Sequence, residues 1–239
     1  MENSNFLTAR WNDLLLLNYE VPPDILKRHL PYKTELDSWN GHYYLSIVGF
    51  HFKDARLMGM KFPYNHTFPE VNLRFYVRHK YEGKWRRGVV FIKKNAPNRL
   101  IGMAANILYK EQFRIINIKH KLEEKGQSIA IEYSLKHGNK WESVKAECEN
   151  DESVLPDSAE EKFIIEHYWG YTKVNENKTL EFKVKHPSWK LHKVSAYNSD
   201  CDLNWLFGSE FHILSETKPQ LVFFAEGSEV VVNRGEYLN

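Results

Sequence analysis

Alternation of hydrophobic and polar positions recurs along much of the chain. The clearest case is residues 71–78, where four apolar residues alternate with Asn72, Arg74, Tyr76 and Arg78. A period of two is typical of antiparallel strands whose two faces meet different surroundings. The same period predicts strands at 129–135, 144–148 and 180–184, and apolar or aromatic runs predict others at 13–19, 42–52 and 88–92. Residues 221–225 and 229–232 are predicted to form a terminal pair of strands around Gly227-Ser228.

Helical signals are few. Residues 22–29 begin with Pro22-Pro23, which suits a first helical turn, and residues 99–111 carry apolar residues at helical spacing. Residues 158–169 start with a capping box and are followed by Gly170, and residues 202–207 precede Gly208. Many strands with few helices predict a mainly β protein, an antiparallel barrel or cone. Without a repeat or a low-complexity linker, residues 1–239 are expected to form a single domain.

Composition narrows the class of protein. A hydrophobic share of 42% supports a sizeable core, and 33 basic against 31 acidic residues leave a net charge of +2 with no basic stripe. We therefore expect no nucleic-acid partner. The apolar run 14–17 is too short to span a bilayer, the first ten residues do not resemble a signal peptide, and two cysteines indicate a reducing compartment. These features predict a cytoplasmic protein without membrane association.

Several common motifs are absent from the sequence. It has no glycine-rich phosphate loop, no G-x-S-x-G elbow and no H-E-x-x-H helix. Its 11 histidines lack ligand spacing, and His186 and His192 come nearest to a pair. The sequence therefore predicts neither a cofactor nor a metal site.

One face of the predicted strand at 71–78 is a candidate site. Continued back to position 70, the alternation places Glu70, Asn72 and Arg74 on the same face. Antiparallel sheets commonly leave one face in water, so alternation alone favours an ordinary solvated face. In a closed barrel, the same residues would line a cavity with a carboxylate, an amide and a guanidinium.

The pair Lys93-Lys94 is a second candidate. Adjacent lysines depress one another's pKa, and a neutral amine attacks a carbonyl to form a Schiff base. Neighbouring residues on a strand point to opposite faces, so only one of the two can enter a pocket. The alternative, favoured because lysines are mostly exposed, is a charged strand end.

The chain resembles the YqjF-like family of bacterial proteins, an uncharacterised family in the acetoacetate decarboxylase-like superfamily. The resemblance runs almost end to end and rests on these segments: 6–11 (FLTARW), 21–23 (VPP), 44–50 (YLSIVGF), 70–77 (EVNLRFYV), 87–91 (RGVVF), 166–171 (EHYWGY), 186–189 (HPSW) and 225–228 (AEGS). It implies a closed antiparallel cone-like β-barrel around a central cavity. It also favours an inward Glu70, because the decarboxylase has a pocket glutamate in a similar strand context.

The resemblance does not extend to decarboxylase chemistry. In the decarboxylase, the Schiff-base lysine follows a phenylalanine-proline pair and precedes a second lysine. Aligning the prolines puts Asn98 and Arg99 at those two places, and an asparagine cannot form an imine. Aligning the lysine pairs selects Lys93-Lys94 instead, where the YqjF-like family usually has arginine and glutamate.

We therefore predict a protein that binds a small carboxylate- or carbonyl-bearing organic molecule in a central cavity. The candidate ligand-binding residues are Glu70, Asn72, Arg74 and Arg99. An arginine would hold a carboxylate, and Glu70 would act as acid, base or hydrogen-bond acceptor. One alternative is a Schiff-base lyase or decarboxylase-like enzyme that uses Lys93 or Lys94. Another is a structural or interaction protein with a packed barrel and no site.

Overall fold

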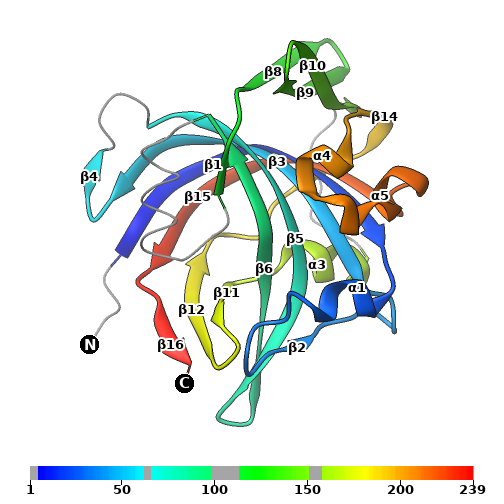
Figure 1. The fold of residues 1–239 in the computed structure, drawn as a ribbon. Helices are drawn as coiled ribbons and strands as arrows, with labels where there is room; N and C mark the ends of the chain where they lie inside the picture. The colour runs from blue at the N-terminus through cyan, green and yellow to red at the C-terminus, as the bar shows by residue number, and fades with distance from the viewer. Residues whose placement is uncertain (1–4, 62–65, 98–112, 151–157, 239) are drawn as a thin grey trace.

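The computed structural model describes residues 5–61, 66–97, 113–150 and 158–238 and arranges them as two β-sheets with short helices (Figure 1). The larger sheet is built from twelve strands. They are β1 (Asn5–Glu20), β2 (Glu35–Leu36), β3 (Tyr44–Leu57), β4 (Met60–Lys61), β5 (Phe68–Tyr81), β6 (Lys84–Ala96), β7 (Phe113–Ile115), β11 (Trp169–Asn175), β12 (Lys178–Lys185), β13 (Leu191–His192), β15 (Leu221–Asn233) and β16 (Glu236–Leu238).

The larger sheet closes on itself. Its strands follow the path β15-β1-β3-β5-β6-β11-β12, and β12 then pairs with β15 through Val184 and Lys185. Most of the pairs are antiparallel, but β6 pairs in parallel with both β11 and β7. The prediction of a mainly β, closed fold is confirmed, with these parallel pairs as the departure from an all-antiparallel barrel.

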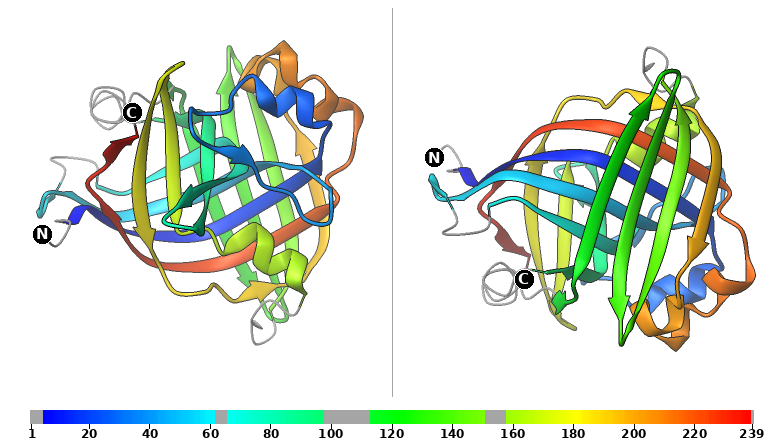
Figure 2. Two further views of the ribbon diagram at one scale, coloured as in Figure 1. Left: turned by 90° about the horizontal axis from the view of Figure 1, so that it is seen from below. Right: turned by 90° about the horizontal axis from the view of Figure 1, so that it is seen from above.

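A four-stranded sheet packs across the outside of this ring (Figure 2). It consists of β8 (Ile118–Lys125), β9 (Ser128–His137), β10 (Lys140–Glu149) and β14 (Val194–Asp200). The short helices in the described residues are α1 (Pro23–Lys27), α3 (Ala159–Ile165), α4 (Leu203–Phe207), the 3₁₀ turn η1 (Ser209–Phe211) and α5 (Ile213–Glu216).

The alternation along β5 separates two hydrophobic clusters. Val71, Leu73, Phe75 and Val77 are almost fully buried in a cluster shared with the four-stranded sheet and with α4, η1 and α5. The opposite face of β5 belongs to the ring interior, where Tyr76 packs with residues of β1, β3 and α3. The four-stranded sheet covers this outer face of β5 in the structure, and the predicted helix at 99–111 lies outside the described residues.

The predicted helix at 158–169 is shorter than expected. Its capping box is present, with Ser158 and Glu161 each accepting a hydrogen bond from the other's backbone N–H, but α3 ends at Ile165. Gly170 lies in β11 instead of ending the helix. A Cβ atom at Gly170 would lie 2.2 Å from Cζ of Phe182, so the glycine is needed for close packing of β11 on β12.

The predicted terminal pair of strands is wrong. Residues 221–233 form one continuous strand, β15, and Gly227 bends it at a φ of +87° without reversing the chain.

The predicted short helices at 22–29 and 202–207 are confirmed as α1 and α4, and Asp202 caps α4.

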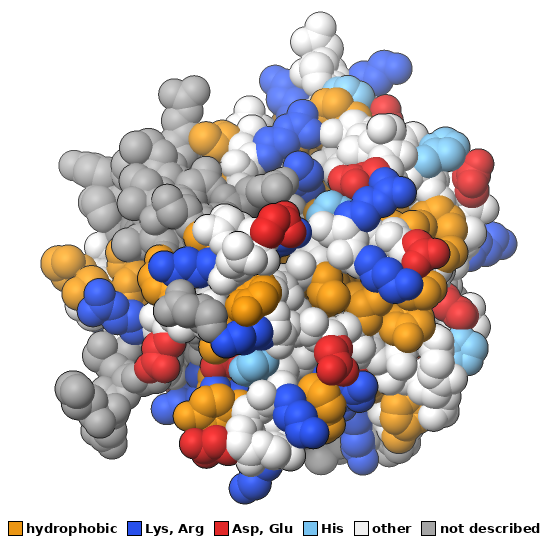
Figure 3. All heavy atoms as spheres, turned by 60° about the horizontal axis from the view of Figure 1, so that its bottom comes forward, with side chains coloured by type: hydrophobic (Ala, Val, Ile, Leu, Met, Phe, Trp, Pro, Cys, Tyr) orange, Lys and Arg blue, Asp and Glu red, His pale blue; other side chains and the backbone are white. Residues whose placement is uncertain are grey.

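Three further expectations from composition concern the surface charge, the length of the helices and the cysteines. On the face shown in Figure 3, basic and acidic side chains are interspersed with hydrophobic ones. Of the helices in the described ranges, none has the length and hydropathy needed to cross a bilayer. Cys148 and Cys201 are both free thiols.

Candidate functional site

The inner face of β5 carries three polar side chains into the ring. In the ladder with β3, Glu70 lies opposite Phe50, and Arg74 lies opposite Ser46. Glu70, Asn72 and Arg74 are only 3%, 1% and 7% exposed. Their side chains are therefore withdrawn from water, in contrast to the solvated face that alternation alone favoured.

The hydrogen bonds of this group are incomplete. Asn72 Nδ2 donates to Glu70 Oε1 over 3.1 Å. Asn72 Oδ1 and Arg74 Nε are buried without a hydrogen-bond partner among the described residues. Arg99, which was predicted to join this site, lies outside the described residues.

A neighbouring set of buried polar side chains is, by contrast, fully engaged. Ser46 Oγ donates to Asn18 Oδ1 over 2.6 Å and also lies 2.7 Å from the Tyr76 hydroxyl. Asn18 Nδ2 donates to the carbonyl of Leu221 over 3.2 Å. This network joins β1, β3, β5 and β15 and fixes the wall beside Arg74. Buried polar groups with complete hydrogen bonding are typical of structural positions, whereas incomplete ones call for an explanation.

The structure separates the two candidate lysines. Lys94 lies opposite Asn72 in the β5–β6 ladder, and its Nζ is 3.8 Å from the centroid of the Phe91 ring. Lys93 lies opposite Leu73 on the other face, beside a surface hollow lined by Phe113 and Trp205. Lys94 therefore shares the inner face with Asn72, and Lys93 belongs to the outer face.

His167 is a part of this region that the sequence analysis missed. It follows α3, and its ring centroid lies 4.7 Å from that of Tyr76. Burial lowers the pKa of His167 well below its usual range, and Arg87 and Arg74 lower it further, so the imidazole is neutral at pH 7. The signal was its place in the segment EHYWGY, one of those that carry the family resemblance.

Another hollow lies at the surface between β14 and α5, with a volume of about 600 Å³. Tyr19, Tyr197 and Leu214 are among its lining residues, and Lys218, an exposed residue, is the charged one among those lining it. It lacks the buried charged and amide groups of the ring interior. The inner face of β5 is therefore the better candidate.

Comparisons with known proteins place the chain in context. Residues 8–229 match the family DUF2071, described as an uncharacterized conserved protein. The chain is 28% identical over 226 residues to the uncharacterized protein YqjF of Bacillus subtilis, a match that covers 92% of this chain and 88% of YqjF.

Solved structures show the same fold at low sequence identity. Acetoacetate decarboxylase from Legionella pneumophila is similar with a TM-score of 0.66 at 13% identity, covering 99% of this chain and 88% of that one. An acetoacetate decarboxylase-like enzyme from Sphingomonas wittichii gives 0.65 at 9% identity, covering 98% and 94%. The enduracididine biosynthesis enzyme MppR, solved with pyruvate, gives 0.62 at 12% identity, covering 98% and 90%. These likenesses confirm the predicted fold.

Proposed function

The chain belongs to the DUF2071 family, and from that premise we propose that the interior of its β ring binds a small organic acid through Arg74, beside Glu70 and Asn72. The observation that carries the proposal is that Arg74 is buried without a compensating anion among the described residues. Its side chain is buried, and within the described segments its Nε has no hydrogen-bond partner and its guanidinium forms no ion pair with an acidic residue. A buried cation is costly unless an anion compensates it.

Ligand chemistry follows from the groups around Arg74. A guanidinium fork matches the geometry of a carboxylate, and Asn72 Oδ1, which has no partner among the described residues, can accept a hydrogen bond from a hydroxyl or an enol. MppR, which shares the fold, was solved with pyruvate, a small 2-oxo acid. These points support a carboxylate that also bears a carbonyl as the ligand class. Arg99 remains a predicted second cation for the same ligand.

The broader assignments are also part of the proposal. We propose that residues 1–239 form one domain that works in the cytoplasm. Two unpaired cysteines support a reducing compartment.

Binding of pyruvate and acetoacetate, measured by isothermal titration calorimetry, tests the assignment of Arg74. We expect Arg74→Gln to weaken binding by at least about tenfold, since a charged hydrogen bond contributes roughly 1.5–3 kcal/mol. Glu70→Gln should change the free energy of ligand binding more than it changes the free energy of unfolding, which urea denaturation measures. Arg28→Gln, at an exposed position, is the matched control and should bind as the wild type does.

Two results would contradict the proposal. One is a wild-type protein that binds neither acid at millimolar concentration. The other is an Arg74→Gln variant that is folded by circular dichroism and binds with unchanged affinity.

A Schiff-base enzyme is the second candidate function, and Lys94 is the lysine that favours it. An imine requires a lysine amine that can approach the carbonyl of the ligand, but Lys94 Nζ lies 3.8 Å from the centroid of the Phe91 ring in a cation–π contact. We therefore expect no adduct by mass spectrometry after treatment with acetoacetate or pyruvate and borohydride. A mass increase that maps to Lys94 and disappears in Lys94→Met would establish the enzyme instead.

A further inference from the structure

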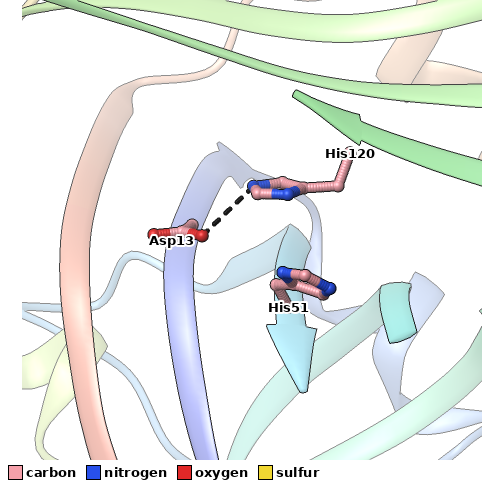
Figure 4. A group of neighbouring side chains, drawn as sticks. All are labelled: Asp13, His51 and His120. Carbon is pink, nitrogen blue, oxygen red and sulfur yellow. Dashed lines mark ion pairs between the residues drawn. The ribbon is translucent and has the colours of Figure 1, made fainter. Parts of the chain in front are cut away.

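Asp13, His51 and His120 meet where the four-stranded sheet packs against the outside of the ring (Figure 4). Asp13 comes from β1, His51 from β3 and His120 from β8. Each residue offers one ligand atom, and these atoms all lie within 4.8 Å of one another. The cluster is on the opposite side of the ring wall from the inner face of β5, so it is separate from the proposed acid-binding site.

The imidazole nitrogens in this cluster are poorly satisfied. His120 Nε2 lies 3.2 Å from Asp13 Oδ2, but the two atoms do not form a well-oriented hydrogen bond. His51 Nδ1 and His120 Nε2 are both buried without a hydrogen-bond partner in the described part of the chain. The two rings lie 4.5 Å apart, centroid to centroid. Buried polar atoms rarely remain unsatisfied, so a bound ion would account for both.

The backbone holds Asp13 in an unusual position. Its φ is +58°, in the left-handed region that few residues other than glycine adopt, at a bulge in the β1–β3 ladder. The fully buried Tyr133 donates a hydrogen bond to the Asp13 carbonyl over 2.6 Å. Gly49 leaves room for that ring, because a Cβ there would lie 2.6 Å from Tyr133 Cδ2. The aspartate is thus fixed from β9 as well as from its own strand.

We propose that Asp13, His51 and His120 bind a divalent transition-metal ion of the zinc type, which ties the four-stranded sheet to the ring. Two imidazoles and a carboxylate are ligands that zinc and its first-row neighbours accept. Metal–ligand bonds of about 2.1 Å put tetrahedral ligand atoms about 3.4 Å apart, so small side-chain rotations suffice to close the cluster.

A neighbouring residue supports this assignment. Asn12 lies directly opposite His51 in the β1–β3 ladder, and its Oδ1 is also buried without a partner among the described residues. It is therefore placed to supply a further oxygen ligand.

The position of the site indicates a stabilising ion. The side chains of His120 and Asp13 are only 13% and 10% exposed, so an ion there would be largely enclosed. It would connect strands that meet only through tertiary packing, because β8 belongs to one sheet and β1 and β3 belong to the other. A ligand that binds only the folded state raises the melting temperature.

The test uses untagged, EDTA-treated protein titrated with Zn²⁺ and, separately, with Co²⁺. We expect one ion per chain, a rise in melting temperature, and visible Co²⁺ absorption that Zn²⁺ abolishes. His120→Gln and Asp13→Asn should weaken Zn²⁺ binding by at least roughly 100-fold, the upper end of the loss seen when an outer-sphere partner is removed. His42→Gln is the matched control, because it alters an exposed histidine–carboxylate pair with Glu20 at 2.7 Å.

The Co²⁺ spectrum of the wild type keeps the test decisive if a variant fails to fold. Absence of a saturable Co²⁺ or Zn²⁺ site in the wild type would overturn the proposal. Undiminished Zn²⁺ binding in folded His120→Gln, or equal losses in His120→Gln and His42→Gln, would overturn it as well.

Discussion

Replacing Gly227 with alanine is expected to prevent the protein from folding stably. Gly227 has a φ of +87°, and a Cβ there would lie 1.8 Å from the carbonyl oxygen of Trp11 and 2.7 Å from Leu14 Cδ1. The first contact is with backbone, so it cannot be relieved by rotating a side chain. We expect the free energy of unfolding to fall by more than about 4 kcal/mol, a loss that single substitutions cause only through severe defects such as overpacking or backbone strain.

Gly83→Ala separates this collision from the cost of a positive φ. Gly83, in the turn between β5 and β6, has a φ of +77°, and no atom of the described residues lies within 4 Å of the position that a Cβ would take. Left-handed backbone alone costs roughly 1–2 kcal/mol for an alanine. Urea unfolding of both variants measures the difference. Similar unfolding midpoints for the two would show that the close approach of β15 to β1 is not needed for stability.

Gly227 also explains why a prediction at the C-terminal end of the chain was wrong. A glycine-serine pair between two apolar runs is a common turn signal. In the structure, the positive φ serves a bend, because Gly227 lies opposite Asn12, next to the bulge at Asp13 in β1. The sequence contains the glycine, but the strand that requires it is more than two hundred residues away. Local signals therefore identify the special backbone position without identifying its partner.

Alternation predicted the strands and their two faces, but it did not predict how the sheets pack together. The pattern along 71–78 correctly separated two faces of β5, since Val71 and Leu73 face one cluster and Asn72 and Arg74 the other. It did not predict that both faces are buried. That depends on closure of the ring through β12 and β15 and on cover from the four-stranded sheet, which are both long-range contacts.

For the candidate sites as well, the sequence pattern was sufficient only where the residues lie on one strand. Asn72 and Arg74 were found because they lie on a single strand, where a period of two fixes their common face. Choosing between Lys93 and Lys94 required the β5–β6 register, which contains an irregularity between Leu73 and Arg74. The cluster of Asp13, His51 and His120 has no spacing signal, because its members come from three strands in two sheets. The expectation of no metal site rested on spacing alone.

Replacing Arg86 with methionine is the second change expected to have a large effect. Arg86 Nη1 lies 2.5 Å from Glu181 Oε2, and its guanidinium stacks between the rings of Tyr81 and Trp169 at 3.7 and 4.3 Å. The Glu181 side chain is only 5% exposed. Removing the arginine leaves a buried carboxylate without its cation, and removal of one partner from a buried pair costs about 3–5 kcal/mol. Because Arg86 itself is partly solvated, we expect the lower end of that range.

A double-mutant cycle distinguishes the lost charge partner from lost packing. Glu181→Leu in the Arg86→Met background should recover most of the stability, since apolar replacement of both partners is often neutral.

Arg78→Met is the matched control, because Arg78 stacks on Trp85 and pairs with Glu35 at 3.3 Å, but in an exposed setting. An exposed pair contributes about 0–1 kcal/mol, so this variant should unfold near the wild-type urea midpoint. If Arg86→Met lost no more stability than Arg78→Met, or if the double variant were no better than the single one, stacking would account for the role of Arg86. In that case the buried carboxylate of Glu181 would not depend on its partner.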